Sequence, residues 1–303
     1  MQIANPIYDV VFKYLMEDEK SAEILISSII DEEIISLELS PQEKTYQLDK
    51  PPLTVYRLDF SAKIKTDTGY KKIVIEIQKA KFATDIMRFR RYLGEQYKDK
   101  ANTYKVENNR KKRQAIPIVT IYFLGYSLDH INTPIIKVAR NYYDKTTGKK
   151  IHVKEDFIES LTHDSYIIQI PHLNDTVQTE TEKLLSVFNQ KFITSDEHIL
   201  SIDELDYPKA YRFIIRRLQR AVAEKEVRDK MEIEDDYLEE LQDKERIIDE
   251  KNKVINDNKK ALTEKDRVLT EKDRVLTEKD IALDEKNKII DELKKELSRQ
   301  KKS

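Results

Sequence analysis

The C-terminal quarter of the chain repeats every seven residues, and this repeat restricts it to a helix. From Leu262 onward the sequence reads LTEKDRV, LTEKDRV, LTEKDIA and LDEKNKI, and neither Gly nor Pro occurs after Pro208. A period of seven is typical of helices that pair as coiled coils. The repeat therefore predicts a long, charged helical tail over residues 224–303, and any globular domain must be built from residues 1–223.

Apolar residues in this tail occur as adjacent pairs. The pairs are Ile247/Ile248, Val254/Ile255, Ala261/Leu262, Val268/Leu269, Val275/Leu276, Ala282/Leu283 and Ile289/Ile290. A coiled coil instead spaces its apolar positions alternately three and four residues apart. The apolar stripe is therefore narrow and its heptad assignment is ambiguous. Two interpretations stay open: a homo-oligomer that forms through residues 240–297, and a solvated helix without a partner.

Composition narrows the class of protein. Charged residues make up 37% of the chain, above the ~25% of typical globular proteins, which agrees with a segment that has no core of its own. Cysteine is absent, so disulfides and Cys-ligated zinc sites are excluded. No apolar run approaches the ~18 residues of a membrane span, and the N-terminus lacks a secretory signal pattern. We expect a cytoplasmic protein that does not bind a membrane.

Residues 1–223 alternate between strand-like and helical patterns. Strands are expected at 53–65, 70–79, 116–124 and 166–171, and helices at 8–30, 84–104, 176–193 and 208–223. This mixture predicts one α/β domain that ends near residue 223. The net charge of −2 is not basic enough to indicate nucleic-acid binding, so any DNA-binding surface must be a local patch.

The strand-like runs 56–65 and 70–79 predict a hairpin, because a four-residue loop that ends in Gly69 joins them. If Lys65 faces Tyr70, then Asp59 faces Glu76, and Gln78 lies two residues further along the same face. Two carboxylates opposite each other repel, and a divalent cation between them would remove that conflict. The alternative is the wet face of a half-exposed sheet, on which Asp59 and Glu76 pair with nearby lysines.

Four short segments carry a resemblance to a known family. They are Asp9-Val10-Val11-Phe12-Lys13, Leu58-Asp59-Phe60, Ile75-Glu76-Ile77-Gln78, and Phe82 followed by Met87-Arg88-Phe89-Arg90-Arg91-Tyr92. In this order they resemble the PD-(D/E)XK nuclease superfamily, in its recombination-promoting nuclease or putative transposase branch, over residues 5–220. The resemblance implies a restriction-endonuclease-like fold, in which helices flank a central mixed sheet.

The same resemblance implies a Mg²⁺-dependent DNA endonuclease that acts in recombination or transposition. Asp59 and Glu76 would ligate the metal, and Asp9 is the candidate third ligand, although an acidic residue there can instead cap a helix. Gln78 stands where the superfamily has lysine and can orient water but carries no charge. The alternative is a catalytically inactive relative that binds DNA, or binds a protein partner through the tail.

A basic stretch follows the Glu-x-Gln segment. Arg88, Arg90 and Arg91 lie in the predicted helix 84–104, and a basic loop is expected at 109–113. Beside a metal site, such a helix is predicted to contact the phosphate backbone of DNA, for which arginine has suitable geometry. The alternative is a solvated helix face. The histidines lack metal-ligand spacing and are expected to be surface or core residues.

Overall fold

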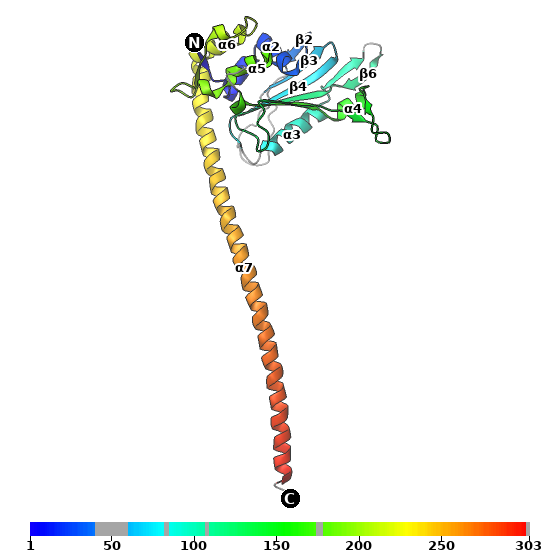
Figure 1. Cartoon of the computed structure of the whole chain (residues 1–303), viewed down its shortest axis with the longest axis vertical. Coiled ribbons are helices and arrows are strands. Elements are labelled where there is room, and N and C mark those ends of the chain that lie inside the picture. The colour runs from blue at the N-terminus through cyan, green and yellow to red at the C-terminus, as the bar shows by residue number, and fades with distance from the viewer. Residues whose placement is uncertain (40–59, 82–84, 107–108, 174–177, 301–303) are drawn as a thin grey trace. The chain divides into compact units, whose positions relative to one another are not determined.

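The chain forms an α/β fold that ends in a long helix (Figure 1). The computed structural model describes residues 1–39, 60–81, 85–106, 109–173 and 178–300. The helices are α1 (Asp9–Met16), α2 (Glu19–Ile30), α3 (Asp85–Lys98), α4 (Asp156–Leu161), α5 (Glu180–Leu185), α6 (Arg212–Ala223) and α7 (Lys225–Gln300). The larger strands are β2 (Ser36–Leu39), β3 (Phe60–Thr66), β4 (Gly69–Gln78), β5 (Thr103–Val106), β6 (Asn109–Ala115), β7 (Ile118–Leu124), β8 (Ile135–Val138) and β11 (Asp164–Gln169). Shorter strands are β1 (Gln2–Ala4), β9 (Tyr142–Tyr143), β10 (Lys150–Ile151) and β12 (Ile199–Ser201).

Six strands form one mixed sheet in the order β2-β3-β4-β7-β11-β8. The first three strands are antiparallel neighbours, β4, β7 and β11 run parallel, and β8 is antiparallel to β11. The connection from β4 to β7 contains α3, as parallel neighbours require a long crossover. The predicted α/β class, with a mixed sheet and a long C-terminal helix, is confirmed.

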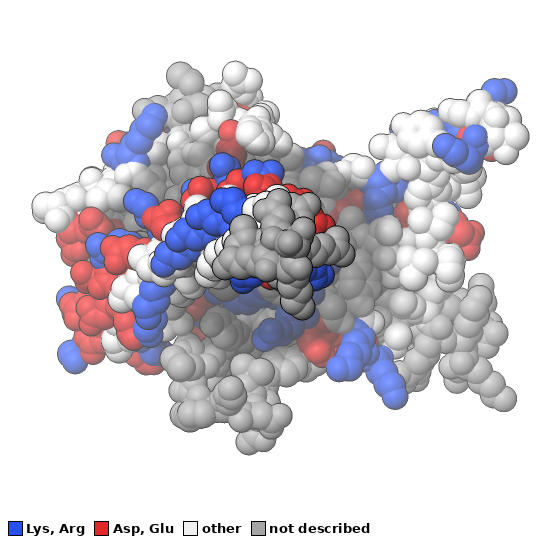
Figure 2. All heavy atoms as spheres, turned by 90° about the horizontal axis from the view of Figure 1, so that it is seen from below, with Lys and Arg blue, Asp and Glu red and all other residues white. Residues whose placement is uncertain are grey.

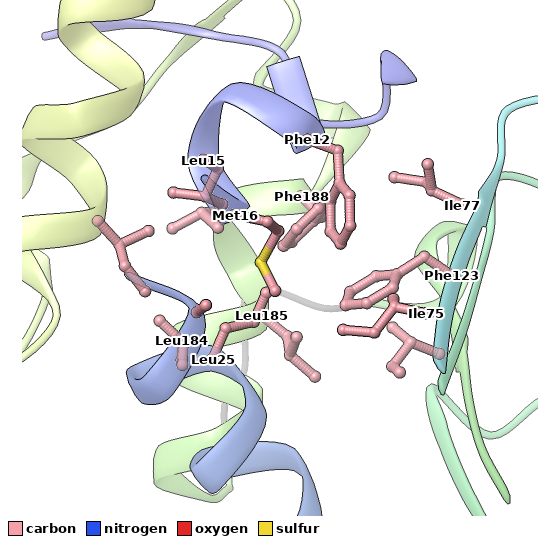
Figure 3. Packing of buried hydrophobic residues seen from close by; sticks show 14 of the residues in the cluster. Phe12, Leu15, Met16, Leu25, Ile75, Ile77, Phe123, Leu184, Leu185 and Phe188 are labelled. Carbon is pink, nitrogen blue, oxygen red and sulfur yellow. The ribbon is translucent and has the colours of Figure 1, made fainter. Parts of the chain in front are cut away.

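One face of the sheet packs against α1, α2 and α5, and the main core lies between them (Figure 3). Apolar side chains of α1 recur at the three- and four-residue spacing that keeps them on one side of a helix. Among them, the Phe12 ring lies 5.4 Å from that of Phe123 on β7, and Phe123 lies 4.8 Å from Phe188. Alternate residues of β4, such as Ile75 and Ile77, project into the same core.

The opposite face of the sheet is covered by α3. Phe89 and Tyr92 of α3 are buried, and the Phe89 ring lies 5.3 Å from the ring of Tyr122 on β7. On this side β4 presents Val74 and Glu76, which are both buried. β4 is therefore enclosed on both faces, and the carboxylate of Glu76 is shielded from solvent on one of them.

Several predicted elements end elsewhere than expected. The predicted helix 8–30 is two helices, since Asp18 accepts a hydrogen bond from the backbone N–H of Ser21 and caps the start of α2. The predicted helix 84–104 ends at Lys98, and the chain then forms the β5–β6 hairpin. The basic residues 109–113 thus lie in strand β6 and not in a loop.

Contacts divide the chain into two units, Met1–Leu238 and Glu239–Ser303. Val227 and Met231 of α7 are buried and belong to the hydrophobic core of the first unit. Residues 225–238 therefore pack with the α/β domain, whereas the expected boundary lay at residue 223. The second unit is helical through residue 300, and every side chain from residue 246 to residue 295 is exposed.

Candidate functional site

Strands β3 and β4 pair in the predicted register. Lys65 lies opposite Tyr70, and the pairing continues to Phe60 opposite Ile75. Asp59 is the next residue before Phe60 and lies outside the described residues. The predicted position of Asp59 opposite Glu76 therefore stays a prediction, but the register that it depends on is confirmed from Phe60 to Thr66.

Glu76 is a buried carboxylate in the middle of the sheet. Its exposed fraction is 3%, and its neighbour in the parallel register is Tyr122 of β7. Burial raises the pKa of Tyr122, and so does the negative charge of Glu76. A hydrogen bond with Thr120 lowers this pKa but does not cancel the rise. The alternative in which Glu76 lies on a wet sheet face is wrong, because Glu76 and its same-face neighbour Val74 are buried.

Gln78 ends β4 two residues beyond Glu76 and is half-buried. Its carbonyl oxygen accepts a 2.7 Å hydrogen bond from the backbone N–H of Gly125, which directly follows β7. A Cβ atom at Gly125 would lie 2.4 Å from the carbonyl oxygen of Lys79 and 3.0 Å from the Cδ1 atom of Ile7. The chain just before α1 therefore packs closely against the end of β4, where Gln78 lies.

Asp9 is the first residue of α1 and comes from this same N-terminal segment. Its carboxylate forms an ion pair with Lys13, and its backbone N–H donates to the carboxylate oxygens of Glu234 at 3.0 and 3.2 Å. The helix-cap interpretation does not apply, because Tyr8 is the N-cap residue and Asp9 lies in the first turn. The Oδ1 atom of Asp9 is buried and accepts no hydrogen bond from the described residues.

Lys79 follows Gln78 and projects from the other side of the strand. Its ammonium group forms an ion pair with Asp235 of α7 and lies 3.7 Å from the centre of the Tyr8 ring. This position combines an ion pair with a cation–π contact. Lys79 is therefore held within a separate cluster, away from the face on which Glu76 lies.

A polar cluster surrounds Asp235 at the point where α7 meets the domain. The hydroxyl of Tyr8 donates to Oδ2 of Asp235 at 2.9 Å, and Nε2 of His198 lies 2.9 Å from the same oxygen. Burial alone would raise the pKa of Asp235, but its hydrogen bonds with Lys79, His198 and Tyr8 hold it below its ordinary value. The cluster fixes residues 225–238 to α1 and to the end of β4.

Glu234, the neighbour of Asp235, has the opposite electrostatic environment. Burial, and then the charge of Asp9, raises the pKa of its carboxyl from 4.5 to about 7. Glu234 and Asp235 lie within the predicted tail, and the sequence pattern predicted no role for either residue. The signal that was present is the apolar pair Val227 and Met231, four residues apart just before them, which is the spacing of a helix packed against a core.

The arginines predicted to contact DNA lie on α3. Arg90 and Arg91 are exposed, whereas Arg88 is half-buried, with its guanidinium 5.5 Å from the centre of the Phe89 ring. Basic and acidic side chains are interspersed on the face of the molecule shown in Figure 2. Arg90 and Arg91 are thus placed where a ligand can reach them, on the helix that covers Glu76.

No metal-binding group is complete within the described residues. Across that part of the chain, no three His, Asp or Glu side chains gather closely enough to hold a metal ion. Neither Glu76 nor Asp9 therefore belongs to such a group within these residues, and Asp59 lies outside them. Among the described helices, none has an apolar stretch long enough to cross a lipid bilayer.

Comparisons with known proteins give no relative. No family model matches the chain, and neither a curated protein nor a solved structure matches it.

Proposed function

We propose that this chain is a metal-dependent nuclease of restriction-endonuclease-like fold that hydrolyses phosphodiester bonds in DNA. The observation that carries the proposal is Glu76, a carboxylate buried in the central strand of a mixed sheet, two residues before the end of that strand. Buried ionisable groups near the end of a sheet strand concentrate at functional sites. The order of the Asp59, Glu76 and Gln78 segments supports the same class.

The donor set suits Mg²⁺, because carboxylate oxygens are the ligands that this ion prefers. Glu76 and Asp59 would hold it, and Asp9, whose buried Oδ1 atom accepts no hydrogen bond from the described residues, is the candidate third ligand. When bound, Mg²⁺ supplies Lewis-acid activation of the phosphodiester. The resemblance places the activity in recombination or transposition.

The protein's own groups would then position the reactants. Gln78, beyond Glu76 on the same strand, can hydrogen-bond a water molecule and hold it in place for attack. Arg90 and Arg91 are exposed on the helix above this face and suit contacts with the DNA backbone. α3 excludes bulk water from Glu76, which strengthens every charge interaction there.

One observation favours a second candidate, a catalytically inactive nuclease-fold protein that binds DNA. Gln78 cannot neutralise charge on phosphate, and the adjacent Lys79 is engaged by Asp235 and Tyr8. The chain would then keep the arginines of α3 for DNA contact without the means of hydrolysis.

Nicking of supercoiled plasmid separates the two candidates. The full-length protein should nick the plasmid in Mg²⁺ and not in EDTA, and Asp59→Ala should abolish nicking. Asp67→Ala is the matched control, because it removes an exposed carboxylate from the β3–β4 turn and should leave nicking unchanged. A wild type that binds plasmid but never nicks it supports the inactive relative. Equal nicking by Asp59→Ala refutes the assigned site.

A further inference from the structure

The tail helix exposes a long series of aliphatic side chains. Among described residues of α7, one large aliphatic residue recurs every seven positions, and each is 46–61% exposed. These are Ile248, Ile255, Leu262, Leu269, Leu276, Leu283 and Ile290. An apolar series of this length on one helix marks an interaction surface.

Opposite charges flank this series at a constant spacing. Leu262 is followed three residues later by Lys265 and four residues later by Asp266, and the next two heptads repeat this arrangement. Val268, in the adjacent apolar position, is also followed by two opposite charges, Glu271 three residues later and Lys272 four residues later. Leu262, Leu269 and Leu276 therefore each have a basic group on one side and an acidic group on the other.

Lys265, Lys272 and Lys279 have no acidic residue three or four positions away in their own helix. The residues three and four positions from Lys265 on either side are Ala261, Leu262, Val268 and Leu269, so no intrahelical ion pair can form. Arg274 behaves differently, because it lies on another side of α7 and pairs with Glu271 at 2.8 Å and Glu278 at 3.9 Å. The charge of Lys265 is left available for another molecule.

The flanking charges distinguish the two ways in which helices can pair. At the coiled-coil value of ~3.5 residues per turn, positions three and four residues on lie about 51° to either side of the apolar residue. In a parallel pair of identical helices, the left flank of one meets the right flank of the other, so lysine faces aspartate. In an antiparallel pair, identical flanks meet, and lysine would face lysine.

We propose that the tail binds a second copy of this chain as a parallel, in-register pair, with its seam along residues 248–290. Lys265 pairs with Asp266 of the second copy, and the pairing recurs at Lys272 and Lys279. The like-charge contacts of the antiparallel arrangement exclude it. Parallel pairing brings two α/β domains to the same end of the paired helices.

Disulfide trapping tests the orientation, because the chain contains no cysteine. The full-length variants Ile248→Cys and Ile290→Cys are each oxidised alone and then as a mixture. Each variant alone should form a disulfide-linked dimer, because in-register parallel helices place identical positions together. Dimers that appear only in the mixture show antiparallel pairing and overturn the proposal, and so does the absence of any dimer.

Charge variants test the seam through the mass in solution. The wild type should have twice the chain mass of 35.9 kDa, and the triple variant Lys265→Glu, Lys272→Glu, Lys279→Glu should be monomeric. Adding Asp266→Lys, Asp273→Lys and Asp280→Lys should restore the dimer. The matched control Lys260→Glu, Arg267→Glu, Arg274→Glu alters charge equally on another side of the helix and should remain dimeric. The assigned seam is refuted if the triple Lys→Glu variant is still a dimer. It is also refuted if the variant with the added Asp→Lys changes stays monomeric while its circular dichroism shows a helix.

Discussion

Replacing Glu234 with glutamine should stabilise the α/β domain in alkaline solution and leave it unchanged in acid. Glu234 is half-buried, accepts hydrogen bonds from the backbone N–H of Asp9, and has a pKa raised to about 7 by burial and by the charge of Asp9. Lys79 and Asp235 also face it, with effects of opposite sign. Glutamine keeps an acceptor for Asp9 and carries no charge at any pH.

The sign follows from the protons bound in each state. Between pH 4.5 and about 7 the folded protein holds a proton on Glu234 that the unfolded chain has lost, so stability falls as pH rises through this window. The difference between the two pKa values corresponds to at most about 3 kcal/mol. For a domain of this size, that amount lowers the melting temperature by roughly 6–10 °C.

Thermal melts at pH 5 and pH 8.5 measure the effect. They are run in EDTA, because a cation bound at Asp9 would change the charge that Glu234 experiences. The wild type should lose roughly 6–10 °C more than Glu234→Gln between the two values. Glu232→Gln removes an exposed carboxylate from the same helix and should follow the wild type. Equal losses in the wild type and Glu234→Gln would show that Glu234 is not held in its neutral form.

Three further predictions concern the packing around the end of β4. Gly125→Ala should destabilise the domain by about 2 kcal/mol in denaturant unfolding, because the added Cβ atom would lie 2.4 Å from a carbonyl oxygen. In the control Gly94→Ala the added Cβ atom meets no atom within 4 Å, so this variant should be neutral or stabilising. Asp235→Asn should cost about 2 kcal/mol in the same assay by weakening the ion pair with Lys79. Residues 1–238 should fold as a monomer with a cooperative melt, and residues 1–223, which lack the buried part of α7, should aggregate or melt at a lower temperature.

The register of the central hairpin was predictable because both strands alternate and a short loop joins them. Gly69 provides the positive φ of 120° that the turn requires, and the pairing of Lys65 with Tyr70 follows from the loop length. The burial of the second sheet face was not predictable from the strand itself. Glu76 gives the strand an amphipathic pattern, but α3 supplies the cover, and which face a crossover helix covers is decided by tertiary packing.

The cluster at Asp235 was beyond sequence reasoning for a different reason. Its members are Tyr8, Lys79, His198 and Asp235, and they come from four distant parts of the chain. A single sequence gives periodicity within an element but carries no signal for ion pairs between elements. The predicted tail began at residue 224 because residues 225–238 share the charged composition of the heptads. In the structure these residues belong to the domain, where Val227 and Met231 are buried.

Lys79 is held by Asp235 and Tyr8. If the chain nicks DNA, the positive charge that stabilises the phosphate must therefore come from another residue. Lys79 projects away from the Glu76 face, so another element has to supply the cation. α3 covers that face, and its half-buried Arg88 lies one turn before the buried Tyr92.

Arg88→Met should therefore slow nicking by on the order of 10²-fold, the cost of losing one charge-stabilising donor. Arg88→Lys should recover part of the rate, which loss of packing alone would not explain. Lys79→Met should lower the melting temperature and leave the nicking rate within about threefold at a temperature where the variant is folded. Loss of nicking in Lys79→Met, with Arg88→Met unaffected, would return the catalytic charge to β4 and contradict the separation of the two clusters.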